Sequence, residues 1–340
     1  MNSERLRSLT SRYGKLRIAV VGDFCLDRYL EIDPERRETS IETGLPVHNV
    51  VRVRSQPGAA GTILNNLVAL GVGVLYPVGF CGVDGEGYEL RQALAARRGV
   101  QLDYFIETDQ RRTFTYCKPL VLAPGQAPME LSRLDSKNWS PTPPPLQERI
   151  IASVQTLARE ADALIIMDQV DQPETGVITQ RLLAALGVLA RELPQRLLVA
   201  DSRRGLRGYP PVCFKMNAAE LAALTGMTSA ADLPAIQAAA AQLARQQNRP
   251  VFVTLAERGI MGVGPDGQAT HVPALPLRGE IDVVGAGDAV TANLTTALAA
   301  GATLDESVVI ANIAASIVIH QLGTTGTATT EQIAEFLGRE

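Results

Sequence analysis

The 340-residue sequence has few aromatic residues, few cysteines and little net charge, and each shortage excludes a class of protein. Only 4% of the residues are Phe, Trp or Tyr, and the formal net charge is -4. Binding of nucleic acid needs a basic face and often aromatic stacking platforms, so we expect no nucleic-acid partner. The four cysteines, Cys25, Cys81, Cys117 and Cys213, are far apart and lack metal-ligand or redox spacing, which indicates reduced thiols in the cytoplasm.

Long apolar runs are also missing. No stretch approaches the roughly 18 apolar residues that span a membrane. Residues 1–17 contain Glu4 and five Lys or Arg residues, and they lack the apolar core and cleavage site of a signal peptide. We therefore expect a cytoplasmic protein that has no membrane partner. The 46% of apolar residues suffice for a sizeable core.

Short apolar runs alternate with helix-like stretches along most of the chain. The runs lie at residues 18–21, 164–167, 197–200 and 251–255. This pattern is typical of buried parallel strands that are joined by helices. The expected helices cover residues 60–70, 145–160, 176–192, 218–225, 232–247, 286–300 and 303–321.

Two segments break the alternation. Residues 30–56 show a partial two-residue periodicity, and residues 111–135 contain several short strand-like runs. Both segments are typical of strands in a small second sheet. We predict one domain over residues 1–340, with a three-layer α/β fold. It has a mostly parallel central sheet, helices on both faces and a small β lid formed by these two segments.

The sequence Gly285-Ala-Gly-Asp288 precedes a predicted helix. Its glycines allow a sharp turn close to a ligand, and the free N–H groups at the start of a helix attract anions. Asp288 stands in the first helical turn, where its carboxylate can accept a proton from a hydroxyl group. An anion site beside a base favours phosphoryl transfer. Taken alone, such a motif is also explained as a glycine turn with a capping aspartate.

Other aspartates follow predicted strands. Asp27, Asp168 and Asp201 come at or after the carboxyl ends of apolar runs. In open parallel sheets ligands bind at this edge, so these side chains and residues 285–288 are expected to meet in one crevice. Taken singly, each aspartate is better explained as a cap of the following helix, so the prediction rests on their convergence.

Four ordered motifs resemble the ribokinase-type (PfkB) carbohydrate kinases. They are Gly22-Asp-Phe-Cys-Leu-Asp27, residues 57–71, Asn217-Ala-Ala-Glu220 and Asp282-Val-Val-Gly-Ala-Gly-Asp288. The resemblance extends from residue 18 to residue 330 and implies a ribokinase-like fold. Four motifs in this order are far more specific than any one of them.

Within the family, the sequence is most similar to the kinase half of the bacterial bifunctional heptose kinase/adenylyltransferases. Residues 22–29, 131–135 and 320–325 carry this likeness. No adenylyltransferase half follows in the sequence, so we expect the kinase to act alone or beside a separate enzyme. The implied reaction is ATP-dependent phosphorylation of a hydroxyl group on a sugar or sugar phosphate. The first candidate is phosphorylation of D-glycero-D-manno-heptose 7-phosphate, as by a heptose 7-phosphate 1-kinase. The alternatives are a kinase for ribose, fructose, a nucleoside or another small alcohol, and a non-catalytic sugar- or nucleotide-binding regulator.

The resemblance also assigns roles to residues, with ATP, Mg²⁺ and optionally K⁺ as cofactors. Asp288 is the implied base, and Gly285, Ala286 and Gly287 form the loop that holds the phosphoryl group. Glu220 is implied to order Mg²⁺ through water, and Asp282 lies where a monovalent cation binds. The implied nucleotide-binding residues are Asn217, Thr254, Gly259 and Asn312. The implied substrate-binding residues are Asp27, Gly58, Ala59, Thr62, Asn66, Arg133, Asp168 and Arg203.

The sequence departs from the family pattern at several of these positions. Ala59 and Ala256 stand where the family has glycine, Thr62 where it has asparagine, and Arg203 where the heptose kinases have lysine. The sugar can therefore differ from heptose or ribose. Arg133, Arg203 and Lys118 are candidates to bind a substrate phosphate, although each is also explained as an ordinary solvated surface residue. Lid segments of this family often pair across a two-fold axis, so we expect a homodimer.

Overall fold

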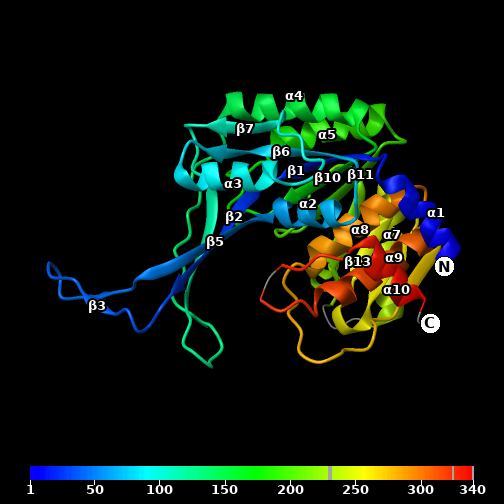
Figure 1. Ribbon diagram of the computed structural model, residues 1–340. Coiled ribbons are helices and arrows are strands. Elements are labelled where there is room, and N and C mark those ends of the chain that lie inside the picture. The colour runs from blue at the N-terminus through cyan, green and yellow to red at the C-terminus, as the bar shows by residue number, and fades with distance from the viewer. Residues whose placement is uncertain (229–231, 324, 339–340) are drawn as a thin grey trace.

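A computed structural model describes residues 1–228, 232–323 and 325–338 (Figure 1). Thr324, part of the predicted motif at 320–325, lies outside the described residues. No helix in these described ranges is long and apolar enough to cross a membrane.

A nine-stranded sheet forms the centre of the molecule. Its strands pair in parallel, except that β13–β14 and β14–β15 are antiparallel. Across the sheet the order is β15 (Ala269–Val272), β14 (Ile260–Val263), β13 (Val251–Thr254), β12 (Cys213–Asn217), β11 (Leu197–Ser202), β10 (Ala163–Asp168), β1 (Arg17–Gly22), β6 (Val74–Gly82) and β7 (Phe105–Thr108).

The apolar runs are buried on both faces because helices cover each side of the sheet. In β1, Ala19 and Val21 belong to one core cluster, whereas Ile18 and Val20 belong to the other. Successive side chains of a strand point to opposite faces, so a continuous apolar run supplies both cores. The predicted three-layer architecture is thereby confirmed.

The helices divide between the two faces (Figure 1). One core cluster contains residues of α4 (Pro144–Glu160), α5 (Gln180–Glu192), α6 (Ala218–Thr225) and α7 (Leu233–Gln247). The opposite cluster contains residues of α1 (Ser3–Tyr13), α2 (Ala60–Ala69), α3 (Gly85–Ala95), α8 (Ala286–Ala299), α9 (Leu304–Val318) and α10 (Thr330–Leu337). The helices α1, α3 and α10 are absent from the helices expected from the sequence.

Two helix starts illustrate how local chemistry sets the boundaries. Thr303 and Glu306 form the predicted capping box at the start of α9. By contrast, α5 begins later than the predicted residue 176, because the Thr179 side chain accepts a hydrogen bond from the Leu182 N–H group and caps the helix there.

The lid is a four-stranded sheet in the order β5 (Val50–Ala59), β2 (Phe24–Ile32), β8 (Phe114–Val121) and β9 (Met129–Glu130). A small hairpin of β3 (Glu38–Thr39) and β4 (Pro46–Val47) lies near its tip, and the lid projects from the body as an arm (Figure 1). The lid begins at Phe24, earlier than the predicted residue 30. Asp27 therefore lies within a lid strand and not in the turn after β1.

Candidate active site

The amino-terminal end of α8 has the geometry of an anion site. Gly285 caps the helix at φ +83°, a conformation that favours glycine. The Ala286 N–H group is engaged by the carbonyl of Val283 at 3.2 Å. Within the described chain, the N–H groups of Gly287 and Asp288 have no hydrogen-bond partner. Two donors at a helix start therefore remain free for an anion.

Asp288 is half-buried in the first turn of α8. Burial raises the pKa of its carboxyl group to about 7, and the charges of Asp201 and Asp27 act in the same direction, while Lys215 opposes them. The charges of Asp201 and Lys215 at the sheet edge and of Asp27 in the lid therefore all act on the Asp288 carboxyl group. A carboxyl group with a pKa near neutrality is suited to accept and release a proton at physiological pH.

An ion pair that the sequence analysis missed lies beneath this loop. Lys215 on β12 and Asp201 on β11 are both buried, and the lysine Nζ lies 2.8 Å from Asp201 Oδ2. Thr291 of α8 places its hydroxyl oxygen 2.9 Å from the same carboxylate oxygen. A Cβ atom on Gly287 would lie 3.0 Å from Lys215 Nζ. In the sequence, the only indication of this ion pair was Lys215 itself, a lysine between apolar residues of a strand.

Asp27 occupies the inner end of the lid. It pairs with Gln56 on β5 and Tyr116 on β8, so these three side chains share one face of the lid sheet. Burial raises the pKa of Asp27, while the positive charges of Lys118 and Arg133 act to lower it. Asp27 is therefore a hydrogen-bond acceptor within a basic surrounding.

The segment after β5 brings α2 against residues 285–288, which we call the anion loop. Ala59, at the start of α2, has φ 54° and ψ -117°, a backbone conformation that glycine adopts far more easily. Thr62 is buried, and its methyl carbon lies 3.6 Å from the position of a Cβ atom on Gly285. Asn66 is fully buried one turn later, where its amide nitrogen donates to the Thr62 carbonyl at 3.0 Å and its side-chain oxygen has no partner.

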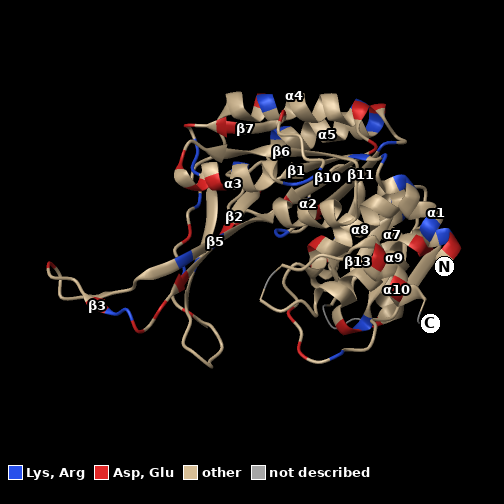
Figure 2. Ribbon diagram, in the orientation of Figure 1, with Lys and Arg blue, Asp and Glu red and all other residues tan. Residues whose placement is uncertain are grey.

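The two predicted phosphate-binding arginines are engaged by carboxylates. Arg133 lies 3.0 Å from Asp135, and Arg203 lies 3.4 Å from Asp171. These partly exposed pairs are weak, so a bound phosphate could compete for either guanidinium group. Figure 2 shows charged residues of both signs along the lid arm.

Lys118 differs from these arginines. Its Nζ lies 5.3 Å from the centre of the Tyr29 ring, and it has no carboxylate partner among the residues that the structure describes. Because Lys118 also lowers the pKa of Asp27, its charge acts on the lid face beside that aspartate. Of the three cations, Lys118 is the most available to an anionic substrate.

Asp168 lies at the end of β10 and is almost fully buried. Its Oδ2 atom accepts hydrogen bonds from Ser202 at 3.0 Å, Arg204 at 2.7 Å and Tyr209 at 3.3 Å. Its Oδ1 atom has no partner. The neighbouring Asp23 accepts three backbone N–H groups from the segment after β10, which explains it as a structural residue.

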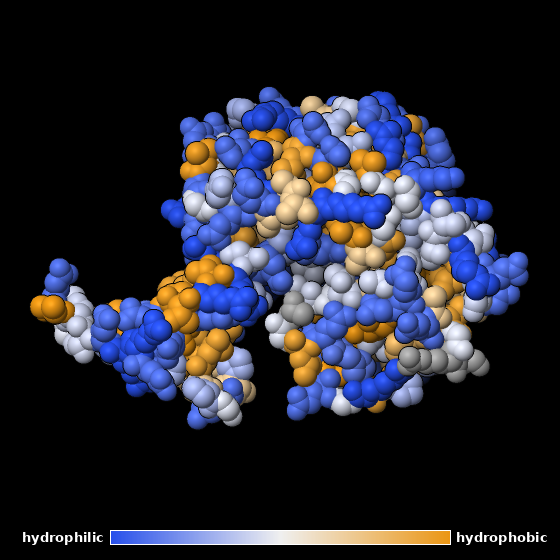
Figure 3. Space-filling model, in the orientation of Figure 1, coloured by the Kyte–Doolittle hydropathy of each residue, from blue (hydrophilic) through white to orange (hydrophobic). Residues whose placement is uncertain are grey.

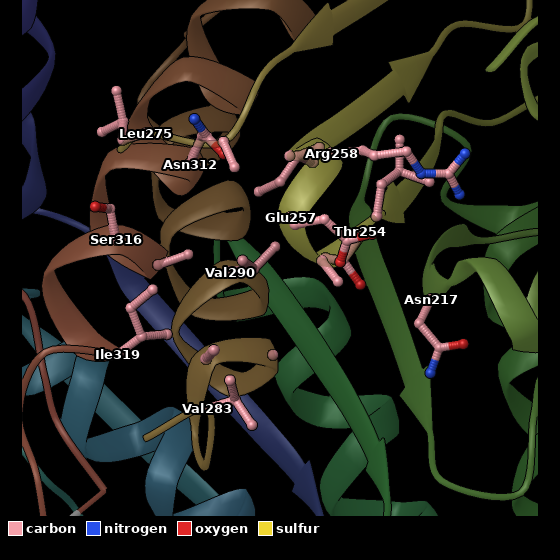
Figure 4. A pocket seen from close by; sticks show the side chains of 18 of the residues that line it. Asn217, Thr254, Glu257, Arg258, Leu275, Val283, Val290, Asn312, Ser316 and Ile319 are labelled. Atoms are coloured by element: carbon pink, nitrogen blue, oxygen red, sulfur yellow. The ribbon is translucent and has the colours of Figure 1, made fainter. Parts of the chain in front are cut away.

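The predicted nucleotide-binding residues line one pocket of about 970 Å³. Its walls include α8 and α9 on one side and the ends of β12 and β13 on the other (Figure 4). Gly259 has φ +91°, and a Cβ atom there would meet the Val272 carbonyl at 2.0 Å, so only glycine fits. The predicted residues in this lining are Asn217, Thr254, Gly259, Asn312, Ala286 and Gly287.

Asn217 and Glu220 form a capping box at the start of α6. The Asn217 side chain accepts the Glu220 N–H group at 2.9 Å, and Glu220 Oε2 accepts the Asn217 N–H group at 2.7 Å. Burial raises the pKa of Glu220, and its second carboxylate oxygen takes no part in the cap. Asp282 accepts the Val284 N–H group at 3.0 Å.

No group of three or more His, Cys, Asp or Glu side chains able to hold a metal occurs within residues 1–228, 232–323 and 325–338. This donor set does not form a protein cage. It fits Mg²⁺ of the kind that keeps several waters and is held mainly by substrate phosphates, with one or two carboxylates nearby.

The sequence matches the pfkB family carbohydrate kinases over residues 15–331. The bifunctional protein HldE of Gluconacetobacter diazotrophicus is 32% identical over 324 residues, and the match covers 95% of this chain. The chain spans only 64% of the length of that relative.

Solved structures share the fold. Arabidopsis thaliana ribokinase, complexed with ribose and ATP, has a TM-score of 0.66 at 20% identity, and the match covers 95% of this chain and 98% of that one. Escherichia coli phosphofructokinase-2 has a TM-score of 0.70 both with its substrates and products and with potassium, at 17% and 19% identity. Both matches cover 95% of this chain, and they cover 99% and 100% of those chains. At these identities the likeness concerns the fold and confirms the predicted ribokinase-like architecture.

Proposed function

This chain belongs to the pfkB family of carbohydrate kinases, and we propose that it transfers the γ-phosphoryl group of ATP to a hydroxyl group of a sugar phosphate. The observation that carries this proposal is Asp288. A carboxyl group with a pKa of about 7 stands beside two free N–H donors, next to the large pocket and near Asp27 of the lid.

The proposed chemistry uses each of these parts. Asp288 accepts the proton of the attacking hydroxyl group while the new O–P bond forms and the bond to the ADP oxygen breaks. The N–H groups of Gly287 and Asp288 stabilise the charge on the phosphoryl oxygens. Such a transition state needs mainly positioning and electrostatic stabilisation, which a preorganised helix start provides.

ATP is the proposed phosphoryl donor, and the large pocket is its proposed site. The pocket volume of about 970 Å³ suits a nucleotide, and its lining combines apolar side chains with a few polar groups such as Thr254 and Asn312. The ribokinase with the same fold was solved with ribose and ATP, which supports the same donor here.

Mg²⁺ is the proposed metal, with Glu220 as the residue that holds its waters. When bound, it would supply positive charge that neutralises the phosphate oxygens. Asp282 remains the proposed neighbour of a K⁺ ion, which the potassium complex of phosphofructokinase-2 supports by analogy of fold.

Lys118 favours an acceptor that already carries a phosphate group. It is a cation without a carboxylate partner in the described part of the chain, and it acts on the same lid face as Asp27. We place D-glycero-D-manno-heptose 7-phosphate first among the acceptors, because the sequence resembles the kinase half of the heptose kinase/adenylyltransferases and is 32% identical to a bifunctional protein HldE. Arg133 and Arg203 are proposed to bind the same substrate phosphate when they release Asp135 and Asp171.

The proposal is tested with a panel of acceptors, ATP and Mg²⁺, with ADP formation as the measurement. The panel contains heptose 7-phosphate, fructose 6-phosphate, ribose, fructose and adenosine. We expect a sugar phosphate to give the highest kcat/KM, and we expect Lys118→Met to lower it about 10-fold or more by raising KM. A higher kcat/KM for an unphosphorylated sugar or for a nucleoside would show that the acceptor is not a sugar phosphate. If no acceptor stimulates ADP formation, the protein is a binding regulator and the kinase proposal is wrong.

A homodimer through the lid is the proposed assembly. Large apolar side chains are exposed on this arm, and Figure 3 shows orange apolar surface gathered there. Contiguous exposed apolar surface is typical of a protein interface. The exposed apolar residues of the lid region are Ile41, Leu45, Val50, Val51, Val53, Met129 and Leu134.

A further inference from the structure

Lys215 is a buried cation at the edge of the proposed active site. It lies on β12, between the apolar residues Phe214 and Met216, and is only 6% exposed. Its Nζ donates to Asp201 Oδ2 at 2.8 Å, and within residues 1–228, 232–323 and 325–338 it has no second hydrogen-bond partner. An ammonium group carries three N–H donors, so two remain unused.

The ammonium group lies against Gly287 of the anion loop. A Cβ atom on Gly287 would lie 3.0 Å from Lys215 Nζ, so the lysine fills the space that a side chain at residue 287 would take. Gly287 belongs to the lining of the large pocket and supplies one of the two free N–H groups. The cation is therefore adjacent to the backbone that faces the pocket.

Stability alone does not account for this arrangement. Exchanging a buried ion pair for apolar residues of similar volume is often neutral or stabilising, because both charges lose their hydration. Two unused ammonium donors add to the cost of burial. Thr291, however, fixes Asp201 from α8, so the pair is held rigidly at the start of that helix. A rigid cation with spare donors matches the requirement of an anionic ligand.

We propose that Lys215 is a catalytic residue whose Nζ contacts the phosphoryl group during transfer, with Asp201 and Thr291 as positioning residues. This inference rests on the proposed function and adds a residue to it. Lys215 keeps its proton throughout: the acceptor proton goes to Asp288, and the electron pair of the broken O–P bond stays on ADP. The lysine adds positive charge where the free N–H groups of α8 already point.

The test compares Lys215→Met, Asp201→Asn and the double variant K215M/D201N with the wild-type protein. Titration calorimetry measures affinity for ATP, ADP and AMP with Mg²⁺, and turnover is measured with the best acceptor. For Lys215→Met we expect affinity for ATP to fall about 10-fold or more with little change for AMP, and kcat to fall about 100-fold. The double variant removes the unpaired carboxylate, so it should regain stability without regaining affinity or turnover.

Two further variants separate charge from folding. Lys215→Arg keeps a cation and should retain more affinity for ATP than Lys215→Met. Arg5→Met removes a 2.8 Å ion pair between α1 and Glu306 of α9, outside the pocket lining, and should leave nucleotide affinity unchanged. Wild-type affinity for ATP and wild-type turnover in K215M/D201N would show that the pair is only structural and would overturn the inference.

Failure of the proposed function gives a different pattern. If the wild-type protein phosphorylates no acceptor, yet Lys215→Met selectively loses affinity for ATP, the kinase proposal fails while the contact between lysine and phosphate stands. If the wild-type protein is active and Lys215→Met keeps both its affinity and its kcat, the inference about Lys215 fails alone.

Discussion

Gly58 and Asp27 are in direct contact across two lid strands. A Cβ atom on Gly58 would lie 2.4 Å from Asp27 Oδ2, although the two residues belong to different strands, β5 and β2. Any side chain at residue 58 would therefore displace the carboxylate. The resemblance to the family implied that Gly58 lets the backbone approach the sugar, whereas the geometry gives it a second role in placing Asp27.

We predict that Gly58→Ala lowers kcat/KM for the acceptor about 10- to 100-fold, because a displaced Asp27 no longer meets the sugar hydroxyl groups. KM for ATP should stay within a factor of about 2 of the wild-type value, since the pocket lies elsewhere. Steady-state kinetics with each substrate varied in turn measure both effects. Gly85→Ala is the control, because a Cβ atom there meets nothing within 4 Å. Unchanged acceptor kinetics in Gly58→Ala would remove Asp27 from the proposed sugar site.

Ala59 and Ala256 both have positive φ values, 54° and 52°. These are two positions where the sequence departs from a family glycine. We predict that Ala59→Gly stabilises the protein by about 1 kcal/mol, because relief of a strained backbone exceeds the extra entropy of glycine in the unfolded chain. Ala256→Gly should give a smaller gain. Denaturant unfolding measures both.

The matched control for these substitutions is Ala152→Gly, at an exposed position within α4. Glycine in an ordinary helical position should cost about 0.5 to 1 kcal/mol. If Ala59→Gly is destabilised as much as this control, the backbone at residue 59 is not strained.

The pKa of Asp288 also predicts a pH dependence of stability. The pKa of its carboxyl group is raised in the folded protein to about 7, above the ordinary value of 3.8. Burial is the main cause, the charge of Asp201 adds to it, Lys215 opposes it, and Asp27 makes a smaller contribution in the same direction as Asp201. The folded state therefore binds the proton more tightly than the unfolded state. The resulting stability is present below pH 4 and is lost as the pH rises towards 7.

Asp288→Asn should remove the loss of stability at high pH, because the asparagine amide stays neutral at every pH. We predict that the variant is more stable than the wild-type protein by about 1 to 2 kcal/mol at pH 8, and that the difference shrinks towards pH 4. Denaturant unfolding at both pH values is the measurement. An equal difference at the two pH values would mean that the pKa of Asp288 is not raised.

The apolar surface of the lid predicts an assembly. Val51 and Val53 alternate along β5 and are exposed, so they share one face of the lid sheet. We predict that V51K/V53K converts a dimer to a monomer in sedimentation analysis, because the charges would be buried at the interface. Val188→Lys, at an exposed valine of α5, should leave the dimer intact. A wild-type protein that is already monomeric would contradict the lid interface.

Much of the fold could be predicted from the sequence because parallel strands leave a strong pattern. Runs such as residues 164–167 are apolar on every position and lie between helices, so both their type and their burial could be predicted. The start of β2 at Phe24 could not be predicted from the sequence. Cys25 and Leu26 face the core, but Asp27 to Leu30 are half-buried lid residues, and no periodicity separates them from a turn.

The residues proposed to bind the nucleotide were named through the family resemblance, and Asn217, Thr254, Gly259 and Asn312 line one pocket. The match of residues 15–331 to the pfkB family carbohydrate kinases confirms the predicted family and enzyme class. It could not reveal Lys215, because a lysine inside a strand becomes meaningful only when Asp201 from the next strand and Gly287 from a distant helix are brought beside it. The roles of these residues remain predictions that the variants test.

Asp288 is the centre of the account, and phosphoryl transfer by Asp288→Asn tests it most directly. Single-turnover product formation and ATP affinity are measured at pH 8 on the same preparations of wild-type protein and variant, with the best acceptor. We predict that the variant binds ATP within a factor of about 3 of the wild type but transfers the phosphoryl group about 1,000-fold more slowly. Transfer at the wild-type rate would contradict the assignment of Asp288 as the base.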